Sequence, residues 1–378
     1  MIYLDNPATT FPKPNCLSEE ISRCIKKYCG NPGRSSHKLS LKSAERIYET
    51  RVKISEIFNS EPENVVFTYN TTYALNIAIK SLLKFSSHVL ISDIEHNSVL
   101  RPIYTLSSLK LCSYDIFSTN GNDDEILDSI NRLIKKETSM LVCSHASNVG
   151  SRRLPIEKIG KLCKEKGITF IVDAAQSAGI YKIDVKEMNI DALCFPAHKS
   201  LYGPQGIGVV VFLKEKGRSI FEGGTGTNSL ELNMPDFLPE KYEPGTLSTP
   251  LISGFLESLN WLTALDINNI RAHEEDLYRI LLDKLKNNEK ITVYEMNDYG
   301  GNTLMFNING IPSTKVSSEL DKRDICTRSG FHCSPLAHKI LKTGEDGAVR
   351  VGFSIYNTRK NVYDLYEAIE DIIISYKK

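Results

Sequence analysis

Short apolar segments alternate with amphipathic ones between about residues 60 and 215. Six of these segments have the length and composition of strands, namely residues 65–68, 88–92, 140–144, 169–173, 192–195 and 208–213. Between several of them, as over residues 74–83 and 156–165, apolar residues recur every three or four positions, which is typical of helices. This alternation predicts an α/β fold with a large, mostly parallel sheet covered by helices on both faces. Ligands of such sheets gather at the carboxyl ends of the strands.

The chain after residue 215 has a different pattern. Residues 219–250 are rich in Gly, Thr, Asn and Pro and predict a long loop. We then expect helices over residues 251–265, 272–287, 313–321 and 362–376, with strands over residues 291–295 and 303–308. Because 378 residues exceed what one hydrophobic core usually serves, we predict two domains. They are a large domain over residues 15–250 and a smaller α+β domain over residues 251–378, against which residues 1–14 pack.

Composition excludes several classes of protein. The chain has 46 Lys and Arg residues and 46 Asp and Glu residues, so its formal charge is zero and we expect no nucleic-acid or membrane partner. The N-terminus lacks the basic start and apolar core of a signal peptide, and we expect a cytoplasmic protein. Nine cysteines are scattered without C-x-x-C spacing, so we predict no metal site and expect most of them to be buried small hydrophobes.

An aspartate and a lysine follow two of the predicted strands. Asp173 closes the strand over residues 169–173, and Lys199 comes after His198, just beyond the strand over residues 192–195. A lysine held against packed backbone is partly desolvated, which lowers its pKa, and the neutral amine condenses with aldehydes. Considered alone, Lys199 is better explained as a solvated lysine at a strand end. Together the two residues match pyridoxal 5'-phosphate (PLP) chemistry, in which the lysine forms a Schiff base and the carboxylate partners the pyridinium nitrogen.

Two further polar segments follow strands. Residues 68–76 lead into a helix predicted to begin near Ala74, whose free N–H groups and positive dipole end would seat a phosphate between the Thr71 and Thr72 hydroxyls. The alternative is that Asn70 or Thr71 only caps the helix. His96 follows the next strand, where it could stack on a flat aromatic cofactor and shuttle protons, or could be an ordinary surface histidine.

Two candidate residues lie in the predicted small domain. Cys333 has His332 beside it and Arg328 nearby, and neighbouring positive charge stabilises a thiolate, so Cys333 is the best candidate for a reactive thiol. An inert loop cysteine is the alternative. Arg350 lies in a predicted strand, where a guanidinium can bind a substrate carboxylate through two parallel hydrogen bonds or can form a structural ion pair.

Taken in order, these motifs resemble those of the cysteine desulfurase and selenocysteine lyase family (SufS-like group), among the class V aminotransferase-type, fold-type I PLP enzymes. The resemblance runs nearly end to end, through Tyr3-Leu-Asp-Asn-Pro-Ala-Thr-Thr10, Thr71-Thr72, Glu95-His96, Ser147-Asn148, Asp173-Ala-Ala-Gln176, His198-Lys199, Glu243-Pro-Gly-Thr246, the cysteine loop, Arg350 and Tyr356-Asn-Thr358. The chain departs from the family pattern at Pro7, where alanine is usual, and at Phe331, where the group often has histidine.

The resemblance implies a role for each matching residue. Lys199 would bond to PLP, Asp173 would pair with the ring nitrogen, Gln176 would bond the ring hydroxyl oxygen and His96 would stack on the ring. The phosphate would be held by Thr71, Thr72 and His198, with Thr246 reaching it from the partner subunit of a homodimer. The substrate would be bound by Asn148, which also lies near the cofactor, and by Arg350, Arg328 and His37.

The resemblance further implies a reaction. The protein would convert L-cysteine to L-alanine, with Lys199 removing the Cα proton and Cys333 taking the sulfur as a persulfide for an acceptor protein. Selenocysteine lyase, or another class V lyase or aminotransferase, is the alternative within the same chemistry. A non-catalytic sulfur-relay subunit is a second alternative, against which the intact pair of Asp173 and Lys199 argues. A dehydrogenase is a third, but no G-x-G-x-x-G motif follows an early strand.

Overall fold

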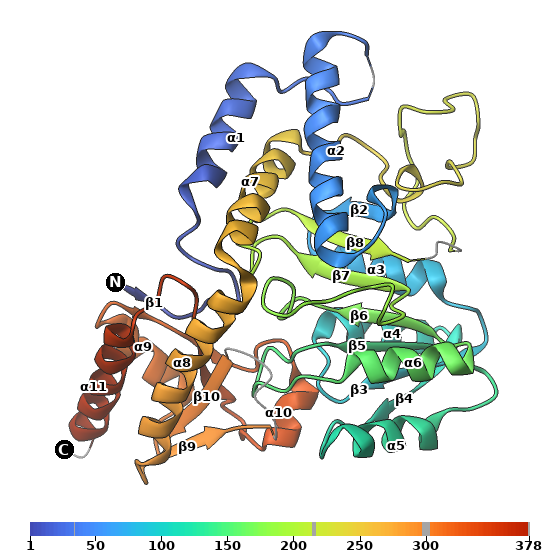
Figure 1. The fold of residues 1–378 in the computed structure, drawn as a ribbon. Helices are drawn as coiled ribbons and strands as arrows, with labels where there is room; N and C mark the ends of the chain where they lie inside the picture. The colour runs from blue at the N-terminus through green and yellow to red at the C-terminus, as the bar shows by residue number, and fades with distance from the viewer. Residues whose placement is uncertain (34, 214–216, 297–302, 377–378) are drawn as a thin grey trace.

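The computed structural model describes residues 1–33, 35–213, 217–296 and 303–376. Within these residues the larger sheet has seven strands (Figure 1). In order across the sheet they are β2 (Val65–Thr68), β8 (Gly208–Phe212), β7 (Ala192–Pro196), β6 (Thr169–Asp173), β5 (Thr138–Ser144), β3 (Ser87–Ser92) and β4 (Cys112–Phe117). β8 is antiparallel to both of its neighbours, whereas the other neighbouring strands are parallel. This confirms the predicted α/β fold with a large, mostly parallel sheet.

Within this sheet, the strand that the sequence did not predict is β4, which lies at one edge. Of its six residues only Cys112 and Phe117, at the two ends, are buried. An edge strand is paired on one side only and can keep polar residues in its middle. β4 therefore lacks the continuous apolar run that marks the central strands.

Helices cover both faces of the sheet because successive side chains of each strand enter two different cores. On one face Val89 and Ile91 of β3 share a core with α3 (Thr71–Leu82) and α4 (Asn97–Ser108). On the other face Leu90 shares a core with α5 (Asp123–Leu133) and α6 (Ile156–Lys166). The first core contains buried residues of α3 such as Leu75 and Ile79, in agreement with the predicted amphipathic helix.

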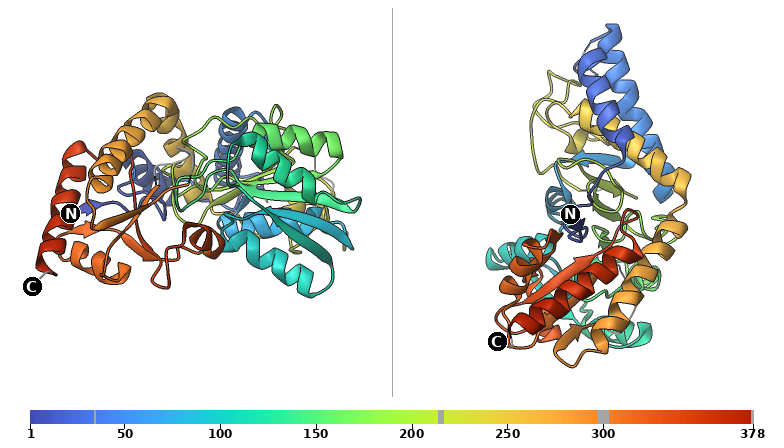
Figure 2. Two further views of the ribbon diagram at one scale, coloured as in Figure 1. Left: turned by 90° about the horizontal axis from the view of Figure 1, so that it is seen from below. Right: turned by 90° about the vertical axis from the view of Figure 1, so that its left-hand side faces the viewer.

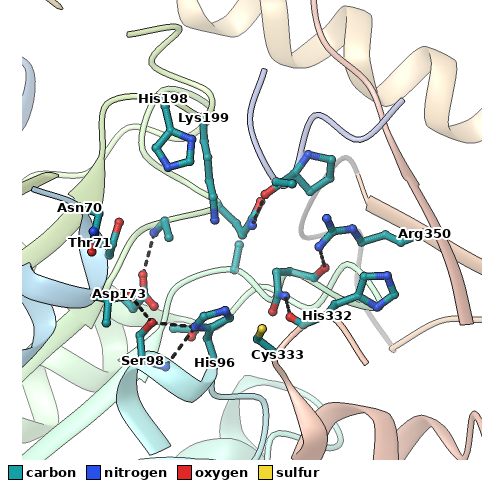
Figure 3. Close-up of a pocket in the computed structure, with 18 of the residues that line it drawn as sticks. Asn70, Thr71, His96, Ser98, Asp173, His198, Lys199, His332, Cys333 and Arg350 are labelled. Carbon is teal, nitrogen blue, oxygen red and sulfur yellow. Dashed lines mark hydrogen bonds between the residues drawn. The ribbon is translucent and has the colours of Figure 1, made fainter. Parts of the chain in front are cut away.

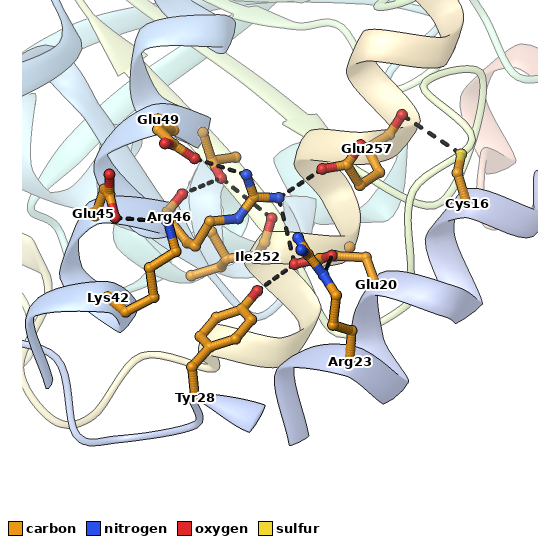
Figure 4. Close-up of polar contacts among 12 residues, drawn as sticks. Cys16, Glu20, Arg23, Tyr28, Lys42, Glu45, Arg46, Glu49, Ile252 and Glu257 are labelled. Carbon is orange, nitrogen blue, oxygen red and sulfur yellow. Dashed lines mark hydrogen bonds and ion pairs between the residues drawn. The ribbon is translucent and has the colours of Figure 1, made fainter. Parts of the chain in front are cut away.

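Three long helices extend from one end of the sheet: α1 (Asn15–Lys27), α2 (Lys38–Phe58) and α7 (Thr249–Leu265). A largely buried ion network joins them (Figure 4). Arg46 of α2 contacts Glu257 of α7 at 2.6 Å and Glu20 of α1 at 3.4 Å, and Glu20 also accepts a hydrogen bond from Tyr28. The guanidinium therefore ties the three helices together at a point remote from the cavity described below.

The C-terminal residues form a second, smaller unit. Its described strands make an antiparallel sheet in the order β12 (Arg328–Gly330), β13 (Ala348–Gly352), β10 (Thr303–Ile308) and β9 (Ile291–Tyr294). Helices α8 (Ile267–Lys286), α9 (Ser313–Asp321) and α11 (Arg359–Ser375) contribute to a separate core over this sheet, and the short α10 is Pro335–Leu341. This is the smaller α+β domain that the sequence predicted.

The chain begins on the small domain. β1 (Ile2–Tyr3) pairs in parallel with β11 (Ile325–Cys326), and Leu4 lies in the small-domain core. Both views in Figure 2 place the N-terminus against this part of the molecule. Residues 15–27 then return to the large domain as α1, so the first residues of the chain connect the two domains.

The position of α7 bears on the domain boundary. We predicted that the small domain begins at residue 251, which falls inside this helix. Its buried residues Ile252, Phe255 and Leu259 belong to the core of the large sheet. We therefore propose that the large domain extends through α7 and that the small domain begins in α8, whose Leu277 is in the small-domain core.

The described part of the connection between β8 and α7, which leaves out residues 214–216, is largely irregular, as predicted, and contains a short 3-10 helix at Glu240–Tyr242. Another 3-10 helix, Pro62–Asn64, precedes β2. In the part of the chain that the structure describes, no helix combines the length and the apolar character needed to cross a bilayer.

Candidate active site

A cavity of about 220 Å³ lies where the carboxyl ends of the central strands face the small domain. The large domain contributes Asn70, Thr71, Thr72, His96, Ser98, Ser144, Ala146, Asn148, Asp173, Ala175, Gln176, His198 and Lys199 to its lining, and the rest is Pro7, Ala8, Arg328, His332, Cys333 and Arg350. Figure 3 shows Asn70, Thr71 and His198 on one side, Arg350 and His332 on the other, and Lys199 between them. The structure thus brings together residues from eight regions of the sequence.

Asp173 ends β6 at the floor of this cavity. Its side chain is 4% exposed, and Oδ1 accepts a hydrogen bond of 2.9 Å from the backbone N–H of Ala175. Burial raises the pKa of this carboxyl group, while the Ala175 hydrogen bond and the nearby Lys199 oppose that rise. A cationic partner in the cavity would therefore stabilise the ionised form of Asp173.

Lys199 extends into the cavity from the turn after β7 (Figure 3). Burial of the amine lowers the pKa of Lys199 to about 8. The positive charges of Arg350 and Arg328 also lower this pKa, whereas the negative charge of Asp173 raises it. This agrees with the desolvated lysine that the sequence suggested. A substantial fraction of the amine is consequently neutral near physiological pH, which a solvated surface lysine would not be.

His96 is the N-cap of α4, and its Nδ1 accepts a hydrogen bond of 3.0 Å from the backbone N–H of Ser98. Burial, together with the charges of Lys199 and Arg328, lowers the pKa of His96 to about 4, so the ring is neutral at physiological pH. The Ser98 hydroxyl lies 2.9 Å from His96 Nδ1 and 2.7 Å from Thr72 Oγ1, which links α4 to α3. The sequence analysis missed Ser98, although its place two residues after a histidine N-cap was a usable signal.

The first turn of α3 forms the side of the cavity opposite Arg350. The helix begins at Thr71, three residues earlier than predicted, and the Asn70 side chain caps it by accepting a hydrogen bond from Tyr73 N–H at 3.1 Å. A Cβ atom on Gly208 of β8 would lie 2.3 Å from the backbone carbon of Asn70, so only glycine allows this close approach. The capping and the phosphate-binding interpretations are compatible here, because Asn70 caps the helix while Thr71 and Thr72 line the cavity.

The cysteine loop is fastened to the large domain. Cys333 is exposed and, like His332 before it, has a positive φ angle, of 58° and 50° respectively. Asn148 holds the loop through both polar atoms of its side chain. Nδ2 donates a hydrogen bond to the His332 carbonyl at 2.7 Å, and Oδ1 accepts one from Ser334 Oγ at 2.6 Å. The Cys333 carbonyl also accepts a hydrogen bond of 2.8 Å from Asn97 N–H at the start of α4.

His332 does not supply the positive charge that we expected beside Cys333. The imidazole is buried, and burial together with Arg350 and the neighbouring His338 lowers the pKa of His332 to about 2. Its Nδ1 lies 3.2 Å from His338 Nε2, with the two rings stacked. The sequence suggested two basic neighbours for the Cys333 thiol, His332 and Arg328. Of these two, only Arg328 therefore carries a positive charge.

Arg350 is 2% exposed and lies on β13 opposite Arg328 of β12. Its Nη2 contacts Asp5 Oδ1 at 2.8 Å, and its Nη1 donates to the Asn148 carbonyl at 3.3 Å. Within the described residues the buried Nε has no hydrogen-bond partner. The guanidinium thus has an acidic neighbour from the N-terminal segment and keeps an open donor. Asp5 was not singled out in the sequence analysis.

Two predicted residues lie outside this cavity. His37 caps α2, with Nδ1 accepting from Ser40 N–H at 3.2 Å, so within one chain it does not reach the substrate side. Thr246 lies beside a second hollow of about 420 Å³, which is lined in part by Phe67, Tyr69 and Tyr73. Gln176 does line the cavity, and its Nε2 donates to the Pro7 carbonyl at 3.0 Å.

The fold and the cavity together define a fold-type I enzyme, in which a lysine and an acid at the carboxyl edge of the large sheet face a small C-terminal domain. Comparison with known proteins agrees. The model of the family described as "Aminotransferase class-V" matches residues 2–365. A "Probable cysteine desulfurase" of Pyrococcus abyssi is 30% identical over 99% of this chain and 95% of the relative. A "Cysteine desulfurase" of Haloferax volcanii is 29% identical over 98% of this chain and 89% of the relative.

The solved structures give the same result. The apo structure of a cysteine desulfurase from Thermococcus onnurineus superposes with a TM-score of 0.91 at 27% identity, covering 99% of this chain and 95% of that one. The chain belongs to the aminotransferase class-V family and, within it, to the group of the cysteine desulfurases.

Proposed function

We propose that the protein is a PLP-dependent cysteine desulfurase, which converts L-cysteine to L-alanine and collects the sulfur on Cys333. The observation that carries the proposal is that Cys333 and Lys199, from different domains, line the same cavity (Figure 3). A buried lysine alone would serve any enzyme of this fold. A thiol on the lining of the same cavity adds a nucleophile that can accept an atom of the substrate, here sulfur.

PLP fits the polar groups that line the cavity. The His198 Nδ1 atom is buried without a hydrogen-bond partner in the described part of the chain, and it lies on the same side as the first turn of α3, where a phosphate would be seated. The buried Asp173 carboxylate suits a protonated ring nitrogen. The residues that would hold the cofactor are Thr71, Thr72, His96, Asn148, Asp173, Gln176, His198 and Lys199. When bound, PLP supplies the electron sink for charge that develops at the substrate Cα atom.

The protein's own groups account for proton transfer and substrate orientation. Because burial lowers the pKa of Lys199 to about 8, this amine can accept the Cα proton near neutral pH. The open Nε of Arg350 would donate to the substrate carboxylate, while Asp5 on Nη2 keeps the guanidinium in place. The neutral His96 ring can lie against a flat cofactor without adding a charge to the cavity.

Sulfur transfer falls to Cys333. Its thiolate bonds to the substrate sulfur, the substrate carbon–sulfur bond breaks, and the carbon takes up a proton to become the methyl group of alanine. The sulfur remains on Cys333 as a persulfide. Because Asn148 and Asn97 hold the loop from two sides, the backbone that carries Cys333 is fixed beside the cavity.

A third hollow, which Cys333 also lines, supports delivery of the sulfur to an acceptor protein. It has a volume of about 380 Å³ and shares Thr72, His96, Ser98 and Cys333 with the cavity, so the thiol stands between the two. Its other lining includes Lys80 and Arg101, and no acidic residue is among its described lining residues. Positive charge there would favour the approach of an acceptor thiolate.

A homodimer would explain the position of Thr246. This residue lies beside the hollow that Phe67, Tyr69 and Tyr73 line, where Tyr69 is 68% and Phe221 45% exposed. Exposed aromatic side chains around a hollow are typical of protein interfaces. We therefore propose that a second copy covers this face and receives Thr246 near its own phosphate position. Light scattering of the purified protein tests this proposal, which predicts twice the mass of one chain.

The direct test uses L-cysteine with the wild type and a Cys333→Ala variant. We expect alanine and a Cys333 persulfide, detected by mass spectrometry, from the wild type, and neither from the variant although PLP remains bound. Cys29→Ala is the matched control, because Cys29 is also exposed but lies far from the cavity in the sequence and structure. Undiminished alanine production by Cys333→Ala would contradict the proposal. If that variant still splits selenocysteine, the selenium substrate needs no thiol, and a selenocysteine lyase becomes the better assignment.

A further inference from the structure

Lys13 lies beneath the turn that carries Lys199, in the segment that connects the small domain to α1. Its Nζ donates to the His198 carbonyl at 2.6 Å and to Thr10 Oγ1 at 2.7 Å. No carboxylate among the described residues forms an ion pair with Lys13. Lys13 is half-buried and contacts a backbone carbonyl and a hydroxyl. This is unusual, because the long side chain of lysine normally extends its charge into solvent.

The same carbonyl has three further donors from this segment. Thr9 Oγ1 and the Thr10 N–H both lie 3.1 Å from the His198 oxygen, and Thr10 Oγ1 lies 3.3 Å from it. The next carbonyl, that of Lys199, accepts from Thr10 Oγ1 at 3.0 Å and from Tyr202 N–H at 2.8 Å. The Thr10 hydroxyl therefore touches Lys13 as well as the backbone on both sides of the Lys199 amide.

The Lys13 contact acts on the peptide unit that joins His198 to Lys199. The His198 carbonyl belongs to the planar group that ends in the backbone nitrogen of Lys199, so its orientation sets the direction in which the Lys199 side chain leaves the backbone. Burial lowers the pKa of Lys13 to about 7, so neither the charged nor the neutral amine is strongly favoured at physiological pH. Both forms carry protons that can be donated to the carbonyl. The hydrogen bond therefore persists on either side of that pKa.

We propose that Lys13 is a positioning residue for Lys199, acting through the His198 carbonyl and the Thr10 hydroxyl. The alternative is that Lys13 only anchors the N-terminal segment to the large domain. The two roles differ in what they affect: an anchor contributes to folding stability, whereas a positioning residue sets how readily Lys199 bonds to the cofactor aldehyde and how the bound ring is oriented. The inference rests on the proposed role of Lys199 toward PLP and is independent of which substrate the enzyme uses.

The experiment compares Lys13→Met, which keeps the length of the side chain and removes its donor, with the wild type and Lys13→Arg. Each protein is freed of cofactor and mixed with PLP in the absence of cysteine. The rate of covalent attachment is followed by absorbance, and the circular dichroism of the bound cofactor is measured per mole bound. Lys53→Met is the control, because Lys53 is similarly shielded, with a 21% exposed side chain, but pairs with Glu56 on α2.

We expect attachment to slow about ten-fold in Lys13→Met, the loss typical of one strong hydrogen bond, with a weaker dichroism signal. Lys13→Arg should recover most of both readouts, and Lys53→Met should match the wild type. If Lys13→Met does not fold, Thr10→Val removes the shared hydroxyl and should slow attachment in the same direction. Wild-type attachment and dichroism in whichever of these two variants folds would overturn the proposal. Borohydride reduction and peptide mapping of the wild type show separately whether PLP bonds to Lys199 at all.

Discussion

Replacing Lys199 by methionine should stabilise the cofactor-free protein. A lysine in the unfolded chain titrates near 10.5, whereas burial lowers the pKa of Lys199 to about 8, so the folded protein disfavours the charged amine. The difference of about 2.5 units corresponds to about 3 kcal/mol at 1.36 kcal/mol per unit. The attraction of Asp173 is already contained in the lowered value, since that carboxylate opposes the effect of burial. Methionine fills a similar volume without a charge, and the cost disappears.

The pH dependence distinguishes this cause from a general packing effect. Because the folded pKa is lowered, the unfolded state binds more protons between about pH 8 and 10.5, and stability rises with pH over that range. The advantage of Lys199→Met should be about 3 kcal/mol at pH 7, about 2 kcal/mol at pH 9 and less than about 1 kcal/mol at pH 10.5.

The assay is urea unfolding of the cofactor-free wild type and variant at these three pH values, with Lys53→Met as control. The control loses only the ion pair with the exposed Glu56 and should change stability by no more than about 0.5 kcal/mol. A difference between wild type and Lys199→Met that does not change with pH, or a variant less stable than the wild type at pH 7, would refute the reasoning. Either result would mean that the amine is not desolvated in the folded protein.

Two further variants test how the site and its support are held. Arg46→Met should lower the free energy of unfolding by about 3 kcal/mol, because it leaves the buried Glu20 without its interhelical partner. The control Arg23→Met replaces a side chain that is 58% exposed and should lower it by less than about 1 kcal/mol. Equal losses in urea unfolding would argue against the network. Asn148→Ala should release the cysteine loop, so hydrogen exchange over residues 331–334 should rise and Cys333 persulfide formation should fall by about ten-fold or more, the effect of losing two buried hydrogen bonds. Unchanged exchange in that variant would show that other contacts hold the loop.

The central strands were predictable because each is buried on both faces and is therefore almost wholly apolar, as in β7 (Ala192–Pro196). β4 was not, because an edge strand needs few apolar residues. The predicted start of α3 was three residues too late, because the threonines in its first turn resemble loop residues. Asn70 had been considered as a cap, and the structure confirms that it caps the helix. The boundary of the small domain depended on the core against which α7 packs. Amphipathic periodicity shows that one face of a helix is buried, but it does not identify the core that buries that face.

The chemistry of the candidate site divides in the same way. Polar residues directly after apolar strands predict one edge of a sheet, so Asp173, His96 and Lys199 could be grouped from the sequence. Cys333 and Arg350 lie far along the chain from that group and in the other domain. Only the family resemblance therefore connected them to the site. The structure shows that both line the same cavity, that Asp5 pairs with Arg350 and that Asn148 holds the cysteine loop.

The sequence by itself determined the layered α/β architecture and the residue types available for catalysis, because the apolar pattern of each segment reflects its burial. Tertiary structure alone decided the charge states and partners of those residues. His332 is neutral and Lys199 has a lowered pKa because of what surrounds them, and Lys13 meets the His198 carbonyl because the chain crosses between domains. Desolvation and pairing depend on neighbours that folding brings from distant parts of the chain, and no local pattern records them.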